Sequence, residues 1–462
     1  MKPYDAIVIG TGQSGPPLAA RLAKSGLQVA VIEQAQFGGT CVNNGCTPTK
    51  TLIASAYAAH LARRSKEYGV ETTGPVAVDM MRVKARKDAV VASSRQSVED
   101  WMRSSPNLTV YRAHGKFVDA HTVRAGNDTL KAERVFINVG ARPLIPKLSG
   151  LDRVSYLTSE SIMDVDSLPE HLVIVGGSYV GLEFAQMYRR FGARVTIVEM
   201  GKRLIGREDS DVSDAVKEIL SAEHIDIRLD AECISLEPEE HGIKVKLNCT
   251  EGAPSVSATH VLLAVGRTPN TDALGLAEIG VKTDKRGYIS VDDELRTSAA
   301  NVYALGDCNG RGAFTHTSYN DYEIVADNLL DGANRKVTDR VQTYALYIDP
   351  PLGRVGMTEA DAERDGLKVL IGKRPMTRVA RAVEKGETQG FMKVMVDADS
   401  KRILGAAILG VGGDEVVQTL VDAIYARLPC SAVRHGVRIH PTVSELIPTV
   451  LEHLEPRAHS DA

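Results

Sequence analysis

The sequence predicts an α/β fold with two similar units of strand, glycine-rich turn, helix and strand, followed by a C-terminal α+β region. In both units the second strand ends at a glutamate. The 462 residues are too many for one hydrophobic core, so we expect several domains. Residues 341–462 differ in character, because short strands precede two helices, around 413–428 and 442–454, and the region does not repeat the pattern of the two units.

The first unit occupies the N-terminal 34 residues. Its elements in order are a strand at 4–9, a turn with Gly10, Gly12 and Gly15, a helix at 16–25, a strand at 29–32 and Glu33. The first glycine allows the turn, the second lets the backbone approach a pyrophosphate, and the third lets the helix pack on the sheet. The phosphates would lie at the helix N-terminus, and the glutamate would accept hydrogen bonds from a ribose. The unit therefore predicts a Rossmann-like dinucleotide site.

The second unit repeats this order. Its elements are a strand at 172–175, the turn Gly176-Gly177-Ser178-Tyr179-Val180-Gly181, a helix, a strand at 194–198 and Glu199. Ser178 stands where the second glycine is expected, which hinders close approach of a pyrophosphate without forbidding it. Two such units in one chain predict two dinucleotides.

The segments that flank the second unit predict how the chain connects its domains. Residues 51–104 predict mostly helix, on which the basic residues 82, 84, 86 and 87 would form a solvated face. Residues 105–145 predict short strands. The similar segments FINVGARP (136–143) and LLAVGRTPN (262–270) each predict a buried strand that breaks at a glycine, where the chain crosses between domains.

Composition excludes several classes of function. The net charge of −4 gives no reason to expect nucleic acid or an anionic membrane as a partner. No apolar run reaches membrane-spanning length. The first ten residues, MKPYDAIVIG, lead almost directly into a strand and leave no room for a signal peptide. We therefore expect a cytoplasmic protein.

Two cysteines, Cys41 and Cys46, stand close together in FGGTCVNNGCTPTKTL. A regular helix would hold their Cα atoms about 8–9 Å apart, and a disulfide needs less than about 7 Å. If the two bond, the segment between them is not regular helix. Zinc needs four ligands, and the other cysteines, at positions 233, 249, 308 and 430, form no second close pair. A structural disulfide across so short a loop would add little stability and would be reduced in the cytosol. These arguments favour a redox-active pair, with no metal site and the other cysteines structural.

The chain as a whole resembles the flavin-dependent pyridine nucleotide–disulfide oxidoreductases, a group that includes dihydrolipoamide dehydrogenase, glutathione reductase and mercuric reductase. The shared motifs are GTGQSG, GGTCVNNGCTPTK, GGSYVGLEFA, TSAANVYALGD and HPTVSE, in this order. The segments PTKTL and PPLGRVGMTE are most similar to mercuric-reductase-like bacterial FAD oxidoreductases.

The resemblance implies two cofactor sites. Asp307 would hold the ribityl chain and phosphates of FAD, and the helix after Phe314 would direct its positive end at the flavin. The residues implied for FAD are Gly10, Gly12, Gly15, Glu33, Gly39, Thr40, Lys50, Gly140, Asp307, Thr315 and His316. Those implied for NAD(P) are Gly176, Gly177, Gly181, Glu199 and Gly266. Glu199 favours NADH because an acid repels a 2′-phosphate, although Lys202 and Arg203 could tolerate NADPH.

The resemblance also implies a route for electrons, from NAD(P)H through the flavin to a Cys41–Cys46 disulfide. Cys46 corresponds to the thiolate beside the flavin, and Cys41 to the outward thiol that attacks the acceptor. His440 corresponds to the base that serves these thiols. It would come from the second subunit of a homodimer, with Glu445 orienting its ring. The alternative for Glu445 is a plain capping box with Thr442.

Two further roles follow from the resemblance. Lys50 and Glu183 correspond to an ion pair near flavin N5, and Tyr179 to the aromatic gate that covers the flavin until nicotinamide arrives. The alternatives are unrelated helix charges and an ordinary packing tyrosine. The implied domains are an FAD-binding domain at 1–148 with a central part at 269–338, an NAD(P)-binding domain at 149–268 and a dimerisation domain at 339–462.

The sequence leaves the acceptor open. The chain ends in HLEPRAHSDA, without the cysteine pair that mercuric reductases carry there, and it keeps His440, which they generally lack. We therefore expect reduction of a disulfide or another small thiol-reactive acceptor. The alternatives are reduction of metal or metalloid ions by the same dithiol, and a non-turnover role as a redox sensor or docking subunit.

Overall fold

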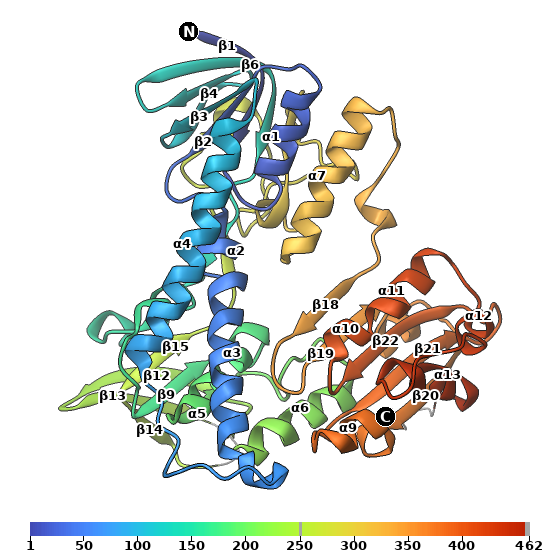
Figure 1. The fold of residues 1–462 in the computed structure, drawn as a ribbon. Helices are drawn as coiled ribbons and strands as arrows, with labels where there is room; N and C mark the ends of the chain where they lie inside the picture. The colour runs from blue at the N-terminus through green and yellow to red at the C-terminus, as the bar shows by residue number, and fades with distance from the viewer. Residues whose placement is uncertain (249–251, 458–462) are drawn as a thin grey trace.

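The computed structural model describes residues 1–248 and 252–457, which form two open α/β sheets and a C-terminal antiparallel sheet (Figure 1). Cys249 lies outside the described residues, as does the side chain of Cys233. Within the described ranges, no helix combines the length and the apolar character that a bilayer crossing requires.

The first sheet carries the N-terminal unit. Its order is β3-β2-β1-β6-β5-β4, with β17 paired to β6. The bounds are β1 (Lys2–Ile9), β2 (Val29–Glu33), β3 (Leu108–Arg112), β4 (Gly115–Asp119), β5 (Thr122–Ala125), β6 (Asp128–Ile137) and β17 (Val302–Ala304). The parallel register places Ile9 beside both Ile32 and Ile137, so the C-terminal ends of β1, β2 and β6 lie side by side at one edge of the sheet. Helices α1 (Gly15–Lys24) and α7 (Thr315–Leu330) share a hydrophobic core with one face of this sheet.

The second sheet is parallel throughout, in the order β11-β10-β9-β15-β8. The bounds are β8 (Leu157–Thr158), β9 (His171–Val175), β10 (Arg194–Val198), β11 (Asp226–Arg228) and β15 (His260–Leu263). Helices α5 (Tyr179–Phe191) and α6 (Ser210–Ala222) pack on one face. The small sheet of β12 (Glu232–Glu239), β13 (Gly242–Asn248) and β14 (Ser255–Ala258) packs on the other. Because both faces are covered, β9 is buried along its whole length.

The two glycine-ended segments that predict chain crossings lie together. Strands β7 (Ala141–Pro143) and β16 (Arg267–Pro269) follow Gly140 and Gly266 and pair antiparallel. Both glycines have positive φ angles, 64° and 129°, which a residue with a side chain rarely adopts. The chain therefore passes between the two open sheets through one short ribbon.

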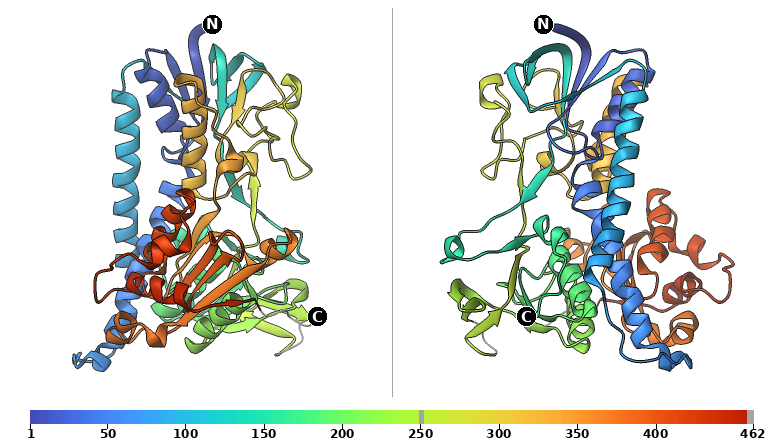
Figure 2. Two further views of the ribbon diagram at one scale, coloured as in Figure 1. Left: turned by 90° about the vertical axis from the view of Figure 1, so that its right-hand side faces the viewer. Right: turned by 60° about the vertical axis from the view of Figure 1, so that its left-hand side comes forward.

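Residues 51–104, predicted to be mostly helix, form two long α-helices separated by a stretch that is not α-helical. Helix α3 (Cys46–Arg63) is followed by a 3₁₀ turn, η1 (Ser65–Tyr68), and then by α4 (Met80–Ser104), which runs along the molecule from the second sheet toward the first (Figures 1 and 2). The expectation of a wholly solvated basic face is wrong for Lys87, which is 4% exposed and pairs with Asp88. A buried ammonium group such as that of Lys87 needs a partner of opposite charge, because burial removes its hydration.

The C-terminal sheet is antiparallel, in the order β18-β19-β22-β21-β20-β23. The bounds are β18 (Thr343–Leu346), β19 (Leu352–Gly356), β20 (Val369–Pro375), β21 (Phe391–Asp397), β22 (Ile403–Leu409) and β23 (Leu454–Pro456). The helices are α8 (Glu359–Arg364), α9 (Ala380–Glu384), α10 (Gly413–Val416), α11 (Gln418–Tyr425), α12 (Cys430–Arg434) and α13 (Ile447–Glu452). The last helix begins later than the expected 442, because Pro448 occupies its first turn and fixes its start at Ile447.

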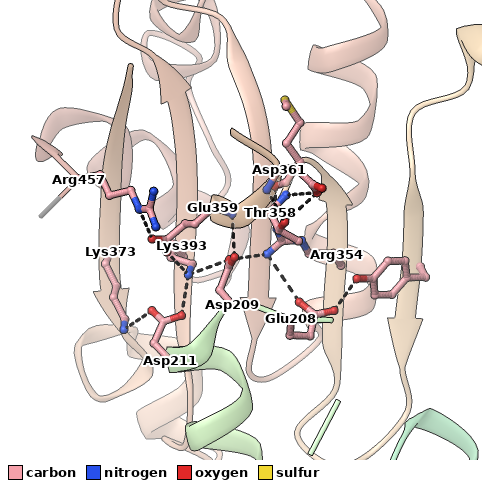
Figure 3. A network of polar contacts seen from close by, with 12 residues as sticks. Glu208, Asp209, Asp211, Arg354, Thr358, Glu359, Asp361, Lys373, Lys393 and Arg457 are labelled. Atoms are coloured by element: carbon pink, nitrogen blue, oxygen red, sulfur yellow. Dashed lines mark hydrogen bonds and ion pairs between the residues drawn. The ribbon is translucent and has the colours of Figure 1, made fainter. Parts of the chain in front are cut away.

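A buried cluster of charges joins the second sheet unit to the C-terminal domain (Figure 3). The Nζ of Lys393 on β21 lies 2.9 Å from Asp209 Oδ2, 2.6 Å from Asp211 Oδ1 and 2.7 Å from Glu359 Oε1. The three carboxylates gather as closely as the ligands of a metal ion would. The Lys393 ammonium, 4% exposed, supplies the positive charge at that point. We call these four residues the Lys393 cluster.

We expect Lys393→Met to destabilise the protein by about 3–5 kcal/mol, because it leaves three carboxylates without their shared cation. Lys373→Met is the matched control. Lys373 pairs with Asp211 from a position that is 45% exposed, and exposed pairs contribute about 0–1 kcal/mol. Urea unfolding of the two variants measures the difference, and equal midpoints would contradict the prediction.

Candidate active site

A cavity of about 800 Å³ lies where the two open sheets meet the cysteine segment. Its volume is within the range of about 300–1,000 Å³ that is usual for ligand and cofactor sites. The predicted site residues that line it are Gly10, Gly12, Glu33, Gly39, Thr40, Cys41, Cys46, Lys50, Gly140, Tyr179, Glu183, Asp307, Thr315 and His316. Gly15, Gly176, Gly177, Gly181, Glu199, Gly266, His440 and Glu445 are not among the residues that line it.

The glycines of the first turn are required by close packing. A Cβ atom on Gly10 would lie 2.3 Å from the Asn138 carbonyl oxygen, and one on Gly15 would lie 2.2 Å from the Gly10 carbonyl oxygen. The Asn138 side chain accepts a hydrogen bond from the Gly15 amide at 2.9 Å and donates one to the Leu305 carbonyl at 2.9 Å. Asn138 therefore ties the turn to the ends of β6 and β17. It stands in FINVGARP, directly after the buried strand, and our sequence analysis did not select it.

The acidic residues that end β2 and β10 both bind their own glycine turns. Glu33 accepts hydrogen bonds from the Thr11 amide and hydroxyl, at 2.9 and 2.6 Å. Glu199 accepts from the Gly177 amide at 2.5 Å and from the Gly201 amide at 2.7 Å. The two units thus share one local geometry, in which the carboxylate at the strand end is held by the turn.

The cysteines stand on either side of a break between two helices. Helix α2 (Gly39–Asn43) contains Cys41, and α3 begins at Cys46 after the irregular Gly45. The interruption agrees with the geometric requirement derived from the spacing. Both cysteines are free thiols. The Sγ of Cys46 lies 3.1 Å from the Thr315 hydroxyl, at the first residue of α7.

The two thiols differ in acidity. The Cys41 thiol donates a hydrogen bond that lowers the pKa of Cys46 to about 6, with further lowering by the Thr315 hydroxyl and the Lys50 charge. The same hydrogen bond, together with burial, raises the pKa of Cys41. Because the two pKa values are shifted in opposite directions, the pair holds one proton on Cys41 and one negative charge on Cys46 near neutral pH. The thiolate is the reactive form of cysteine.

Lys50 lies one turn after Cys46 and is fixed from two sides. Its Nζ lies 2.7 Å from Glu183 Oε2 and 4.5 Å from the centre of the Tyr347 ring. The other Glu183 oxygen accepts a hydrogen bond from the Tyr347 amide at 3.0 Å. A partly exposed cation is therefore held at the cavity wall. No motif in the sequence pointed to Tyr347, since its contact depends on how β18 meets α5.

Two more predicted residues, Asp307 and His316, have defined surroundings. Burial raises the pKa of the Asp307 carboxyl, and the Arg267 guanidinium, with Nε 3.5 Å from Asp307 Oδ2, opposes this rise. The Nε2 of His316 donates to the Thr343 carbonyl at 2.7 Å, and burial lowers the pKa of His316, which favours the neutral ring. Arg267 lines the cavity but was not among the predicted site residues.

His440 and Glu445 lie together in the C-terminal domain. The Nδ1 of His440 lies 3.0 Å from Glu445 Oε2, and the His440 side chain is 74% exposed. The Glu445 amide also donates to the Thr442 hydroxyl at 3.2 Å, so capping and ring contact occur together. A histidine oriented by a carboxylate is thus presented on the surface of this domain.

We expect the Cys46 thiolate of the dithiol protein to titrate with a pKa of about 6, so it is present above that pH and lost as the pH falls through it. Thr315→Val removes one hydroxyl donor and should raise this pKa by about one unit. Ultraviolet absorbance of the thiolate follows the titration.

The matched control is Thr51→Val, because the Thr51 hydroxyl donates to the Thr47 carbonyl within α3. A Cys46 thiol that titrates at about 8.5 in the wild-type protein, the ordinary value for cysteine, would contradict the prediction. So would equal shifts in the two valine variants.

The comparisons with known proteins agree over nearly the whole chain. Residues 4–321 match the model of the "Pyridine nucleotide-disulphide oxidoreductase" family, and residues 343–451 match its "dimerisation domain". The chain is 35% identical to the "Probable pyridine nucleotide-disulfide oxidoreductase RclA" of Escherichia coli K12, over 96% of this chain and 98% of that protein. It is 30% identical to a "Mercuric reductase" of Lysinibacillus sphaericus, over 96% of this chain and 80% of that protein.

A solved structure is similar over the same length. It is described as a Cu(II) complex of the HOCl-induced flavoprotein disulfide reductase RclA from Escherichia coli. The TM-score is 0.89 at 34% identity, and the match covers 98% of this chain and 99% of that one.

Proposed function

The chain belongs to the pyridine nucleotide-disulphide oxidoreductase family, and from this premise we propose that Cys41 and Cys46 pass electrons from NAD(P)H to a disulfide or another thiol-reactive acceptor. The family and the fold class that the sequence predicts are confirmed. The family comprises flavoprotein oxidoreductases that bind FAD and a pyridine nucleotide. The observation that carries the proposal is the free cysteine pair, with one acidic thiol, in a cavity lined by the first glycine turn and by α5.

The residues of the cavity fit FAD. The turn at Gly10 and Gly12 exposes backbone at the start of α1, where a pyrophosphate is favoured by the helix dipole. The Nε of Arg267 is buried and has no hydrogen-bond partner in the part of the chain that the structure describes, so a bound group can satisfy it. Asp307 would hold the ribityl hydroxyls, and Lys50 would lie beside the ring system. When bound, FAD supplies the two-electron relay between nicotinamide and the cysteines.

The two cysteines divide the acceptor reaction. Two electrons and one proton convert the Cys41–Cys46 disulfide into a Cys41 thiol and a Cys46 thiolate. Deprotonated Cys41 attacks the acceptor disulfide, a mixed disulfide forms and one thiol leaves. The Cys46 thiolate then attacks the Cys41 sulfur, the second half of the acceptor leaves as a thiolate that takes a proton from solvent, and the Cys41–Cys46 bond is restored. The raised pKa of Cys41 means that this attack needs a base.

We assign that base to His440 of the partner subunit, with Glu445 orienting the ring. The match to a dimerisation domain and the exposed histidine–carboxylate pair support a homodimer in which each subunit completes the other's site. The proton of Cys41 would pass to the His440 Nε2, since Nδ1 faces Glu445.

We favour NADH over NADPH. Glu199 is held by two backbone amides at the end of β10, where a ribose is expected, and its negative charge would repel a 2′-phosphate. Lys202 and Arg203 are exposed nearby and soften this preference. The ratio of kcat/KM for the two nucleotides measures the preference.

Metal ions are the second candidate acceptor. The solved structure of the relative RclA is a Cu(II) complex, and another relative is a mercuric reductase. The same dithiol could deliver two electrons to two Cu(II) ions, or to one Hg(II) ion, for each NAD(P)H oxidised.

We expect Cys41→Ser to reduce turnover with disulfide acceptors by at least about 10³-fold, because the attacking thiol is lost. NAD(P)H oxidation by the FAD-loaded protein is measured with a panel of disulfides, quinones, Cu(II) and Hg(II). Cys430→Ser, in the C-terminal domain, is the matched control and should keep full activity. If Cys41→Ser keeps full activity with every acceptor, a thiol-independent diaphorase replaces this mechanism; if no acceptor is reduced by the wild type, the redox-sensor alternative is favoured.

We expect mixed dimers to reveal the shared site. Cys41→Ser and His440→Gln homodimers should each lose disulfide turnover, the latter by about 10²-fold or more. After subunit exchange, one site in each mixed dimer is intact, so about one quarter of wild-type activity should return. Failure of mixing to restore activity would place His440 outside the partner's site.

A further inference from the structure

Glu208 connects the predicted gate tyrosine to the C-terminal domain. It lies just before α6 and next to Asp209 of the Lys393 cluster. Its Oε1 accepts a hydrogen bond from the Tyr179 hydroxyl at 3.0 Å and a second one from the Tyr344 hydroxyl on β18. One carboxylate oxygen therefore binds two phenols, one from the wall of the cavity and one from the C-terminal sheet.

The carboxylate is buried and faces a fixed positive charge (Figure 3). The Glu208 side chain is 0% exposed, and its Oε2 lies 3.7 Å from Arg354 Nη1. Arg354, on β19, is itself held by Asp209 at 2.9 Å and by the Met357 carbonyl at 2.7 Å. Because a buried carboxylate needs such a charge, the position of Glu208 is set by the C-terminal domain rather than by its own loop.

Tyr179 is held at both ends. Its backbone begins α5, and its ring packs edge-on against Tyr344, with centroids 5.4 Å apart, and against Phe314, with centroids 6.3 Å apart. Burial and the Glu208 charge raise the pKa of Tyr179, so the phenol keeps its proton and donates. To leave the cavity wall, the ring must give up a hydrogen bond to a charged acceptor, which is stronger than one to a neutral acceptor.

We propose that Glu208 is a positioning residue that latches Tyr179 at the cavity wall and so sets how readily the nucleotide reaches its binding position. This inference rests on the proposed function, because it takes Tyr179 as the gate. A latch that favours the closed position raises the apparent dissociation constant in inverse proportion to the open population. Weakening the latch should therefore tighten apparent NADH binding without changing the step that follows.

The experiment compares holoenzyme variants by rapid mixing with NADH and by following the flavin absorbance. Glu208→Gln keeps the size of the side chain but replaces the charged acceptor of the Tyr179 hydrogen bond by a neutral, weaker one, and Tyr179→Phe removes that hydrogen bond from the other end. We expect each to lower the apparent dissociation constant for NADH about three- to tenfold, with the limiting rate of flavin reduction kept within about twofold in Glu208→Gln. The double variant should show no further decrease beyond Tyr179→Phe, because both changes act on the same hydrogen bond.

Tyr344→Phe is the matched control. It removes the other phenol from Glu208 and leaves the Tyr179 bond in place, so the apparent dissociation constant should stay at the wild-type value. Three outcomes would overturn the latch: a wild-type constant in Glu208→Gln, multiplicative effects in the double variant, or the same decrease in Tyr344→Phe. Wild-type holoenzyme whose flavin NADH does not reduce would instead overturn the proposed function.

Discussion

Four helices begin at or beside the wall of one cavity, and the chemistry of the site depends on this convergence. Helix α1 begins at Gly15, α3 at Cys46, α5 at Tyr179 and α7 at Thr315. The helix dipole places a partial positive charge at each of these starts, so the cavity favours negative groups. The thiolate of Cys46 is one such group within the chain itself. The open sheets, the glycine turns and the crossing ribbon are what bring these four starts together from distant parts of the sequence.

The break in the helix between the cysteines creates their asymmetry. If α2 continued into α3, the two sulfur atoms would lie on different parts of a helix surface, and only a rearrangement could join them. The irregular Gly45 instead places Cys46 at a helix start, beside Thr315 and near Lys50, while Cys41 stays in the short helix before it. A shared proton then distinguishes two chemically identical side chains. The order of attack in the proposed cycle follows from this local geometry.

Local patterns in the sequence predict the strands, turns and helix starts, because a glycine turn or a buried strand depends mainly on neighbouring residues. The two units, the mostly helical segment at 51–104 and the crossing segments were all predicted within a few residues. Contacts between distant segments were not. Asn138, Tyr347 and Glu208 gain their roles from partners more than 100 residues away in the chain, or from the packing of one domain on another. Lys87 was assigned to solvent for the same reason, since its burial depends on where α4 packs. The domain boundaries and the individual site roles stay predictions.

Glu208 is adjacent in sequence to Asp209 of the Lys393 cluster, and Arg354 forms ion pairs with both carboxylates. Asp209 and Asp211 face the ammonium of Lys393, while Glu208 accepts hydrogen bonds from the hydroxyls of Tyr179 and Tyr344. Three acidic positions within four residues therefore divide between a buried ion-pair cluster and two phenols. Because buried charges must be matched, the loop before α6 can occupy this position only when β19 and β21 are in place beside it. The C-terminal domain therefore does more than present a surface for a second subunit. Its strands supply Tyr344 and Arg354, which contact the Glu208 carboxylate beside Tyr179, so this part of the cavity wall depends on how the domains pack together.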